Sequence, residues 1–152
     1  MRILLVVDMQ KSFIKMEPYF SLNEKIQSLI DNGNYDKLIF TKFINDKAKN
    51  SLFIDRLNWM GLTSLEEQEL SLNVPTNSII LAKYSYGLTQ EQIDYIKSLN
   101  VNEIDICGVQ AEACVYAIAL QLWDNGIYPN ILINYVLGEI DMKNIFIKQF
   151  GK

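Results

Sequence analysis

Short apolar runs alternate with segments of helical periodicity along the whole chain. The apolar runs are 3–7, 37–41, 78–82, 103–107 and 130–133, and they are rich in Ile, Leu and Val. Runs of this kind, bounded by polar turns, are typical of strands buried in a parallel sheet. Strands that alternate with helices predict an α/β fold, in which helices cover both faces of the sheet.

The helical segments between these runs carry recognisable end signals. The sequences at 21–24 (SLNE) and 89–92 (TQEQ) have the form of capping boxes, so we expect helices to begin there. Residues 52–60 and 115–123 predict two further helices, and a last helix is expected from Asp141.

Together these elements predict a single three-layer αβα domain over residues 1–152, with a mainly parallel, Rossmann-like sheet of five to six strands. No internal repeat, low-complexity tract or linker divides the chain. In such a sheet, ligands bind outside the carboxyl ends of the strands, which makes the residues after each strand candidate site residues. We expect the first and fourth strands to be neighbours.

Composition limits the possible partners and location. The net charge of −4, without a dense block of Lys or Arg, argues against nucleic acid as a partner. The apolar run at 3–7 is stopped by Asp8 and is too short for a signal peptide, and no run approaches the roughly 20 apolar residues of a membrane span. Two cysteines do not make a disulfide framework, so we expect a reducing cytoplasm as the location.

Three reactive side chains follow three of the predicted strands. Asp8 follows the first strand, Lys83 the third, and Cys114 comes after the fourth, at the start of a helical segment. A thiol at a helix N-terminus lies at the positive end of the helix dipole, so we expect it to ionise more readily. The chain has no histidine. Asp8 would therefore accept the thiol proton, while Lys83 would balance the charge.

Each of these residues also has an ordinary structural role. An aspartate after a strand can cap a loop, a lysine can lie on the surface, and a cysteine is often buried and inert. Cys107 lies inside the strand pattern and is interpreted as core packing. The joint placement of the three reactive residues at strand ends favours catalysis.

Three segments resemble motifs of one known superfamily. The segment 5–13 (LVVDMQKSF) is similar to an opening strand with a catalytic Asp, Lys83 matches a catalytic Lys after an apolar strand, and 107–115 (CGVQAEACV) matches a Gly-Val-x-Thr-Asp-x-Cys-Val signature. These motifs resemble the isochorismatase-like cysteine hydrolases, which include nicotinamidases and N-carbamoylsarcosine amidohydrolases. The resemblance runs from Met1 to about Asn134.

The resemblance implies a mechanism. Asp8 would deprotonate Cys114, whose thiolate would attack a carbonyl carbon, and the backbone amides of Gln110 and Cys114 would form the oxyanion hole. A cis peptide is implied between Val109 and Gln110. Ammonia or an amine would leave, and water would hydrolyse the resulting thioester.

The resemblance and its departures also bear on the substrate. Phe13 would line the substrate pocket, with Trp59 as a second candidate. Nicotinamidases carry an Asp/His metal site that a chain without histidine cannot match, so no metal and no other cofactor is expected. Isochorismate-cleaving members commonly lack the cysteine, so Cys114 favours a C–N bond in a small amide or carbamoyl-like substrate. Ala111 and Glu112 replace the usual Thr-Asp pair.

The C-terminal part is shortened relative to the family after Tyr135. This shortening would leave an edge of the pocket open, or leave it to a partner subunit. Because family members commonly assemble, we expect a homodimer or a higher homo-oligomer.

Two other functions stay open. The altered loop and the shortened C-terminus are compatible with a catalytically weak or inactive ligand-binding or interaction module of the same fold. A nucleotide-binding domain is a weaker alternative, because no G-x-G-x-x-G follows the first strand and the chain has no phosphate loop.

Overall fold

The apolar runs pair side by side into one fully parallel sheet in the computed structural model, which describes residues 1–151. The five strands are β1 (Ile3–Val7), β2 (Lys37–Phe43), β3 (Ile79–Lys83), β4 (Glu103–Gly108) and β5 (Tyr128–Val136). Their order in the sheet is β3-β2-β1-β4-β5. The predicted α/β class is confirmed, and so is the expectation that the first and fourth strands are neighbours.

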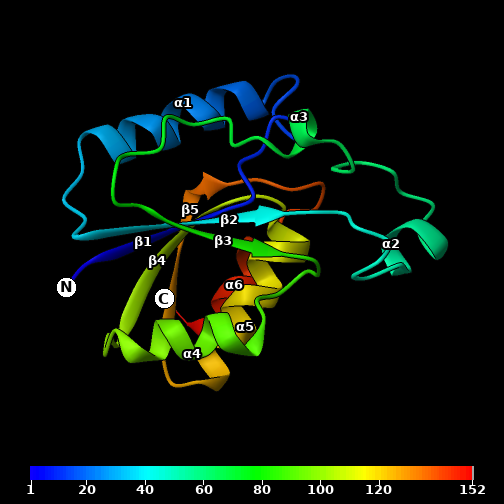
Figure 1. Ribbon diagram of the computed structural model, residues 1–152. Coiled ribbons are helices and arrows are strands. Elements are labelled where there is room, and N and C mark those ends of the chain that lie inside the picture. Colours follow the sequence, from blue (N-terminus) through cyan, green and yellow to red (C-terminus); the bar gives the residue numbers. More distant parts are fainter. Residues whose placement is uncertain (152) are drawn as a thin grey trace.

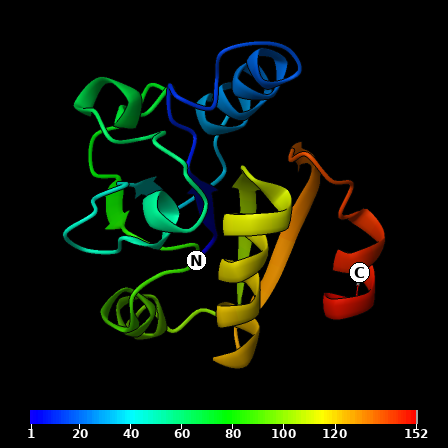
Figure 2. The same cartoon turned by 90° about the vertical axis from the view of Figure 1, so that its right-hand side faces the viewer.

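Helices cover both faces of this sheet (Figure 1). The longer helices are α1 (Tyr19–Asp31), α4 (Gln90–Ser98), α5 (Tyr116–Asp124) and α6 (Lys143–Phe150), and the single turns are α2 (Leu52–Asp55), α3 (Leu65–Gln68) and the π-helical turn η1 (Ala111–Val115). Helix α1 lies on one face, whereas α4, α5 and α6 pack on the other. Figure 2 shows α6 beside β5, at the edge of the sheet opposite β3. None of the helices between residues 1 and 151 has the length and apolar character that crossing a membrane requires.

The alternation of side chains along β1 builds both halves of the core. Every residue of this central strand is buried. Leu4 and Val6 belong to the cluster under α1, while Ile3, Leu5 and Val7 belong to the cluster under α4, α5 and α6. Because successive side chains of a strand point to opposite faces, a run of five apolar residues is what a two-sided sheet requires here.

One of the two capping-box predictions is correct. Helix α4 begins with Thr89 and Gln92 in a reciprocal box, as expected. Helix α1 begins earlier than predicted, at Tyr19, and Ser21 already lies inside its first turn. The carboxylate of Glu17 accepts hydrogen bonds from the Ser21 backbone N–H at 3.3 Å and from its hydroxyl at 2.7 Å, so Glu17 supplies the cap that the motif assigned to Ser21.

The helix predicted over 52–60 is only the single turn α2. Asn58 has a φ of 52°, which ends helical geometry, and the Trp59 N–H returns to the Phe53 carbonyl at 3.0 Å. This turn carries the chain beyond the carboxyl ends of β2 and β3 (Figure 1).

The chain leaves β1 and β4 in opposite directions across the sheet. From β1 it passes through α1 to β2, and from β4 through α5 to β5, so the gap between β1 and β4 is the topological switch point where α/β proteins bind ligands. Gly108 closes β4 with a φ of 119°, and a Cβ there would collide with the carbonyl oxygen of Val7. Glycine is therefore required for β4 to lie this close to β1.

Replacement of Gly108 by alanine should destabilise the protein more than the same change at another glycine of positive φ. Gly126→Ala is the matched control, because Gly126 has a φ of 77° and, apart from its neighbours in the chain, no atom lies within 4 Å of the position that an alanine Cβ would take. We expect Gly126→Ala to cost about 1 kcal/mol of unfolding free energy and Gly108→Ala at least about 3 kcal/mol. Urea denaturation measures both, and equal losses would contradict the steric requirement at the switch point.

Candidate active site

Three side chains from separate parts of the chain meet at the carboxyl edge of the sheet. Asp8 follows β1, Lys83 ends β3, and Cys114 lies in η1 after β4. The Lys83 ammonium crosses β2 and reaches both partners, with Nζ 3.0 Å from Asp8 Oδ2 and 3.3 Å from Cys114 Sγ. Asp8 and Lys83 are completely buried, and Cys114 is 7% exposed. All three catalytic candidates named from the sequence therefore lie together.

The buried ammonium of Lys83 is held by more than its two reactive neighbours. Its Nζ donates to the backbone carbonyls of Ser85 at 2.9 Å and Tyr86 at 3.1 Å, and it lies 4.7 Å from the centre of the Phe43 ring. Burial lowers the pKa of Lys83, but the charge of Asp8 and the contact with Cys114 outweigh burial, and the pKa stands above its ordinary value. Lys83 is therefore charged at neutral pH.

The two carboxylate oxygens of Asp8 have different roles. Oδ1 accepts a hydrogen bond from the Thr41 hydroxyl at 2.6 Å, and that hydroxyl accepts one from the Asp8 backbone N–H at 3.0 Å. Oδ2 faces Lys83 in the ion pair but accepts no aligned hydrogen bond from residues 1–151. Thr41 thus fixes the carboxylate through one oxygen and leaves the other with a lone pair that can receive a proton.

Thr41 was not among the residues predicted from the sequence. A signal for it exists, because the apolar run at 37–41 ends on this polar residue, just as Asp8 and Lys83 stand at the ends of other strands. The strand in fact continues to Phe43, so that Thr41 lies beside β1 in the sheet interior.

Gln10 ties the end of β1 to the end of β2. Its side-chain oxygen accepts from the Phe43 N–H at 2.9 Å, and its amide donates to the carbonyls of Phe43 and Gln68, each at 2.9 Å. The hydrogen-bonding partners of this buried amide are backbone groups, so Gln10 positions the loop that carries Phe13.

Cys114 does not have the lowered pKa that its position at a helix start suggested. Burial raises the pKa of the Cys114 thiol, the charge of Asp8 raises it further, and the opposing effect of Lys83 is smaller. The expectation of easy ionisation was wrong because a dipole effect is small beside burial and a nearby carboxylate. At neutral pH the site holds a thiol next to a carboxylate that can take its proton.

The nucleophile turn has an unusual backbone. The Val109–Gln110 peptide bond is cis. The Val115 N–H bonds the Gln110 carbonyl at 3.2 Å, five residues back, so Cys114 lies in a π-helical turn just before α5. The Gln110 side chain accepts a hydrogen bond from the Tyr19 hydroxyl at 3.1 Å, which links this turn to the start of α1.

A cavity of about 300 Å³ opens onto Cys114. Most of its wall is apolar, and the lining residues are Phe13, Phe43, Phe53, Leu57, Trp59, Tyr86, Gln110, Glu112, Ala113, Cys114 and Glu139. Phe13 and Trp59, both named from the sequence, have nearly parallel rings with centroids 6.3 Å apart.

Three other lining residues, Phe53, Tyr86 and Glu139, were not predicted from the sequence. They reach the cavity from loops and short turns that leave no periodic signal. Asp8 and Lys83 do not line the cavity, so Cys114 alone of the three faces it.

Glu112 fastens the segment after β5 to the nucleophile turn. Its carboxylate accepts a hydrogen bond from the Glu139 N–H at 3.2 Å and packs so closely on Gly138 that a Cβ there would collide with it. The Ala111 N–H also donates to the Leu137 carbonyl at 2.9 Å. Glu112 and Glu139 both line the cavity, so this part of its wall is formed within one chain.

The second cysteine has a different environment. Cys107 is fully buried within β4, in the cluster beneath α1, and burial raises the pKa of its thiol. It does not line the cavity that opens onto Cys114, so it serves as an internal reference for that residue.

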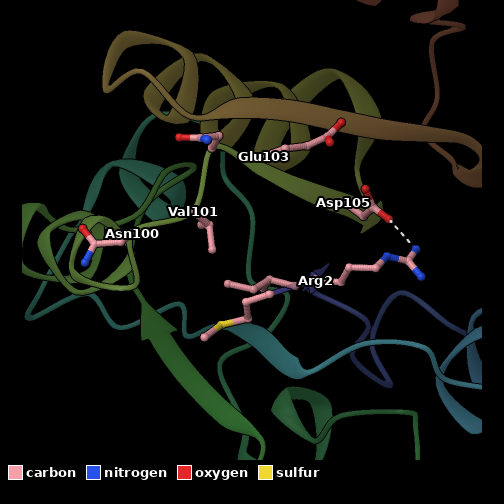
Figure 3. A pocket seen from close by; sticks show the side chains of 8 residues that line it. Arg2, Asn100, Val101, Glu103 and Asp105 are labelled. Atoms are coloured by element: carbon pink, nitrogen blue, oxygen red, sulfur yellow. Dashed lines mark ion pairs between the residues drawn. The ribbon is translucent and has the colours of Figure 1, made fainter.

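Another hollow, of about 320 Å³, lies at the opposite edge of the sheet, where β1 and β4 begin (Figure 3). Figure 3 shows Arg2 paired with Asp105, at 3.6 Å. Asp105 also accepts hydrogen bonds from the Tyr35 hydroxyl at 2.7 Å and from Asn130 at 2.8 Å. Its carboxylate is occupied by structural partners, and the lining of the hollow includes no cysteine or lysine, so the carboxyl edge is the better candidate.

The sequence profile of the isochorismatase domain family matches residues 2–134 of this chain. Among curated proteins, none matches it in sequence.

Several solved structures are similar to it across nearly their whole length. The pyrazinamidase of Pyrococcus horikoshii in complex with zinc is 20% identical, with 97% of this chain and 93% of that chain covered and a TM-score of 0.77. The N-carbamoylsarcosine amidase from Thermoplasma acidophilum is 17% identical, with coverages of 99% and 94% and a TM-score of 0.78. The nicotinamidase from Staphylococcus aureus is 21% identical, with coverages of 99% and 94% and a TM-score of 0.74. At such identities the likeness establishes the fold alone.

Removal of one partner of the buried ion pair should cost more stability than removal of both charges. Lys83→Met leaves the Asp8 carboxylate buried without a cation, which should cost about 3–5 kcal/mol of unfolding free energy. The double variant Asp8→Asn, Lys83→Met should lose less than Lys83→Met alone, because no buried charge remains. Urea denaturation at neutral pH measures all variants, and strict additivity of the single losses would contradict the pairing.

Asp8→Asn should make the Cys114 thiol more reactive toward iodoacetamide at neutral pH. The Asp8 charge raises the pKa of this thiol and Lys83 lowers it, so loss of the carboxylate leaves the ammonium unopposed. The alkylation rate should rise about three- to fourfold for each unit by which the pKa falls, because a larger thiolate fraction is partly offset by a less nucleophilic thiolate. Mass spectrometry of the Cys114 and Cys107 peptides measures both rates, with Cys107 as the unreactive reference. An unchanged or slower rate at Cys114 would show that Asp8 does not oppose its ionisation.

Proposed function

This chain belongs to the isochorismatase domain family, as its three motifs indicated, and we propose that it is a metal-independent cysteine amidohydrolase. In this proposal it cleaves a C–N bond of a small amide or carbamoyl-like substrate through a thioester on Cys114. One observation carries the proposal: Lys83 Nζ lies 3.0 Å from Asp8 Oδ2 and 3.3 Å from Cys114 Sγ, beside a carboxylate oxygen that has no aligned donor among residues 1–151.

Acylation begins with transfer of the thiol proton from Cys114 to Asp8 Oδ2. The sulfur electron pair then attacks the substrate carbonyl carbon and forms a C–S bond. The backbone N–H groups of Gln110 and Cys114, in the cis-peptide turn, stabilise the oxyanion. Lys83 remains protonated throughout. Its ammonium stabilises the negative charge both when the charge is on Asp8 and when it is on Cys114.

Asp8 next returns the proton to the leaving nitrogen. The C–N bond breaks, ammonia or an amine departs, and the acyl group stays on Cys114 as a thioester. In deacylation, a water molecule gives a proton to Asp8 and attacks the thioester carbon. The C–S bond then breaks, and the proton returns to the sulfur, which restores the thiol.

The residues of this chain do not fit the metal site that the family implies. The pyrazinamidase of Pyrococcus horikoshii was solved in complex with zinc. This chain contains no histidine, and within residues 1–151 no group of three or more Cys, Asp or Glu side chains is arranged to hold a metal ion. Around the thiol, the wall is built instead from aromatic rings, among them Phe43 and Trp59. The proposed steps therefore rest on Asp8, Lys83 and Cys114.

We also propose that residues 1–152 form one hydrolase domain that acts in the cytoplasm as a homodimer or higher homo-oligomer. Two free cysteines and the absence of a disulfide within the described chain suit a reducing compartment.

The nucleophile assignment is tested by ammonia release from a panel of small amides, including nicotinamide and N-carbamoyl amino acids. Cys114→Ala should lower kcat/KM by about 1,000-fold or more, because the covalent route is lost. Cys107→Ala, the matched control, should keep turnover within a few-fold of the wild type. Wild-type protein that is thermally stabilised by a panel member without ammonia release would support the alternative, a ligand-binding module of this fold.

A further inference from the structure

A second cavity, of about 340 Å³, adjoins the one that contains Cys114. Its lining residues are Asn50, Leu52, Phe53, Arg56, Leu57, Ser85 and Tyr86. Phe53, Leu57 and Tyr86 line both cavities, so the two spaces share one wall. We call the second cavity the α2 subsite, because Leu52 and Phe53 belong to α2.

The α2 subsite leaves large apolar side chains open to water. Leu52 and Leu57 are each 59% exposed and Tyr86 is 45% exposed, on a surface that continues into the catalytic cavity. The Phe53 ring lies beneath them and packs edge-on against Tyr86, with centroids 5.0 Å apart. A contiguous exposed apolar surface that leads into a reactive cavity is typical of a ligand-binding groove.

The geometry of the buried pair fixes how an amide lies in this groove. The leaving nitrogen must receive its proton from Asp8, which is completely buried and does not line the cavity. The nitrogen therefore points toward the buried end of the site, which favours ammonia over a bulky amine as the leaving group. The substituent on the carbonyl carbon points the other way, past Phe53 and Tyr86 toward α2.

We propose that the α2 subsite binds an apolar arm of the acyl group, so that the substrate is the primary amide of an apolar carboxylic acid. This inference rests on the proposed amidohydrolase function. The amide and the Cys114 thiol give a thioester and ammonia, and water then gives the free acid and restores the thiol. Continuity of the two cavities through Phe53, Leu57 and Tyr86 favours one ligand that spans both over a separate partner on α2.

The inference is tested with a series of primary amides: acetamide, butanamide, hexanamide and octanamide. As the chain grows into the subsite, kcat/KM should rise by about fourfold for each methylene that is buried. Leu52→Asp places a charge in the α2 subsite but not in the cavity at Cys114. It should reduce kcat/KM for octanamide by at least about tenfold while acetamide stays within about twofold.

The matched control is Leu65→Asp. Leu65 is the first residue of α3, as Leu52 is of α2, and it is exposed but lines neither cavity. This variant should preserve the whole chain-length profile. Size-exclusion chromatography of both variants accompanies the kinetics. If Leu52→Asp changes the oligomeric state and leaves the profile intact, α2 contacts a second copy of the chain and the inference is overturned.

Two further measurements separate this inference from the proposed function. If short amides are hydrolysed in a Cys114-dependent manner but kcat/KM does not rise with chain length, the function stands and the subsite assignment is overturned. Calorimetric titration of Cys114→Ala with each amide tests the subsite without turnover. Octanamide should bind at least about tenfold more tightly than butanamide, and addition of Leu52→Asp should remove the difference. Equal affinities would overturn the assignment whether or not the wild type hydrolyses any amide.

Discussion

The ion pair between Lys83 and Asp8 sets the conditions that the rest of the site must meet. Both side chains are completely buried, and neither charge would be stable there alone. The neighbouring strands β2 and β3 hold the pair: Thr41 binds one carboxylate oxygen, the Phe43 ring lies under the ammonium, and the loop after β3 supplies two carbonyls. The close approach of β4 at Gly108 then brings the nucleophile turn to the same point.

The site is divided between a charged interior and an apolar exterior. Asp8 and Lys83 are shielded from water, whereas the cavity that a ligand can enter has a mostly apolar wall in which aromatic rings are the largest side chains. Cys114 lies at the boundary and contacts both regions. Such a division suits a neutral substrate, because an amide can lose its water at an apolar wall while the charges needed for proton transfer are already in place.

The sequence predicted those features that depend on periodicity and strand ends. Continuous apolar runs identified all five strands, and the strand-end rule found Asp8 and Lys83. Two similar capping motifs had different outcomes because Glu17, outside the motif, caps α1 in place of Ser21. The state of the Cys114 thiol was not predictable, since it depends on burial and on a carboxylate far away in sequence. The aromatic wall was largely missed because loop conformation decides which rings meet there.

The strand order also governs when this site can exist during synthesis. β1 is the first strand to be made, but it pairs on one side with β2 and on the other with β4, where Leu4 lies opposite Asp105. An all-parallel sheet with its first strand in the centre is dominated by contacts between distant residues, which slows folding. The nascent chain must therefore carry the open edge of β1, with Asp8 at its end, until β4 has left the ribosome. An unpaired apolar edge of this kind can pair with other chains, so the nascent chain is exposed to aggregation until β4 is made.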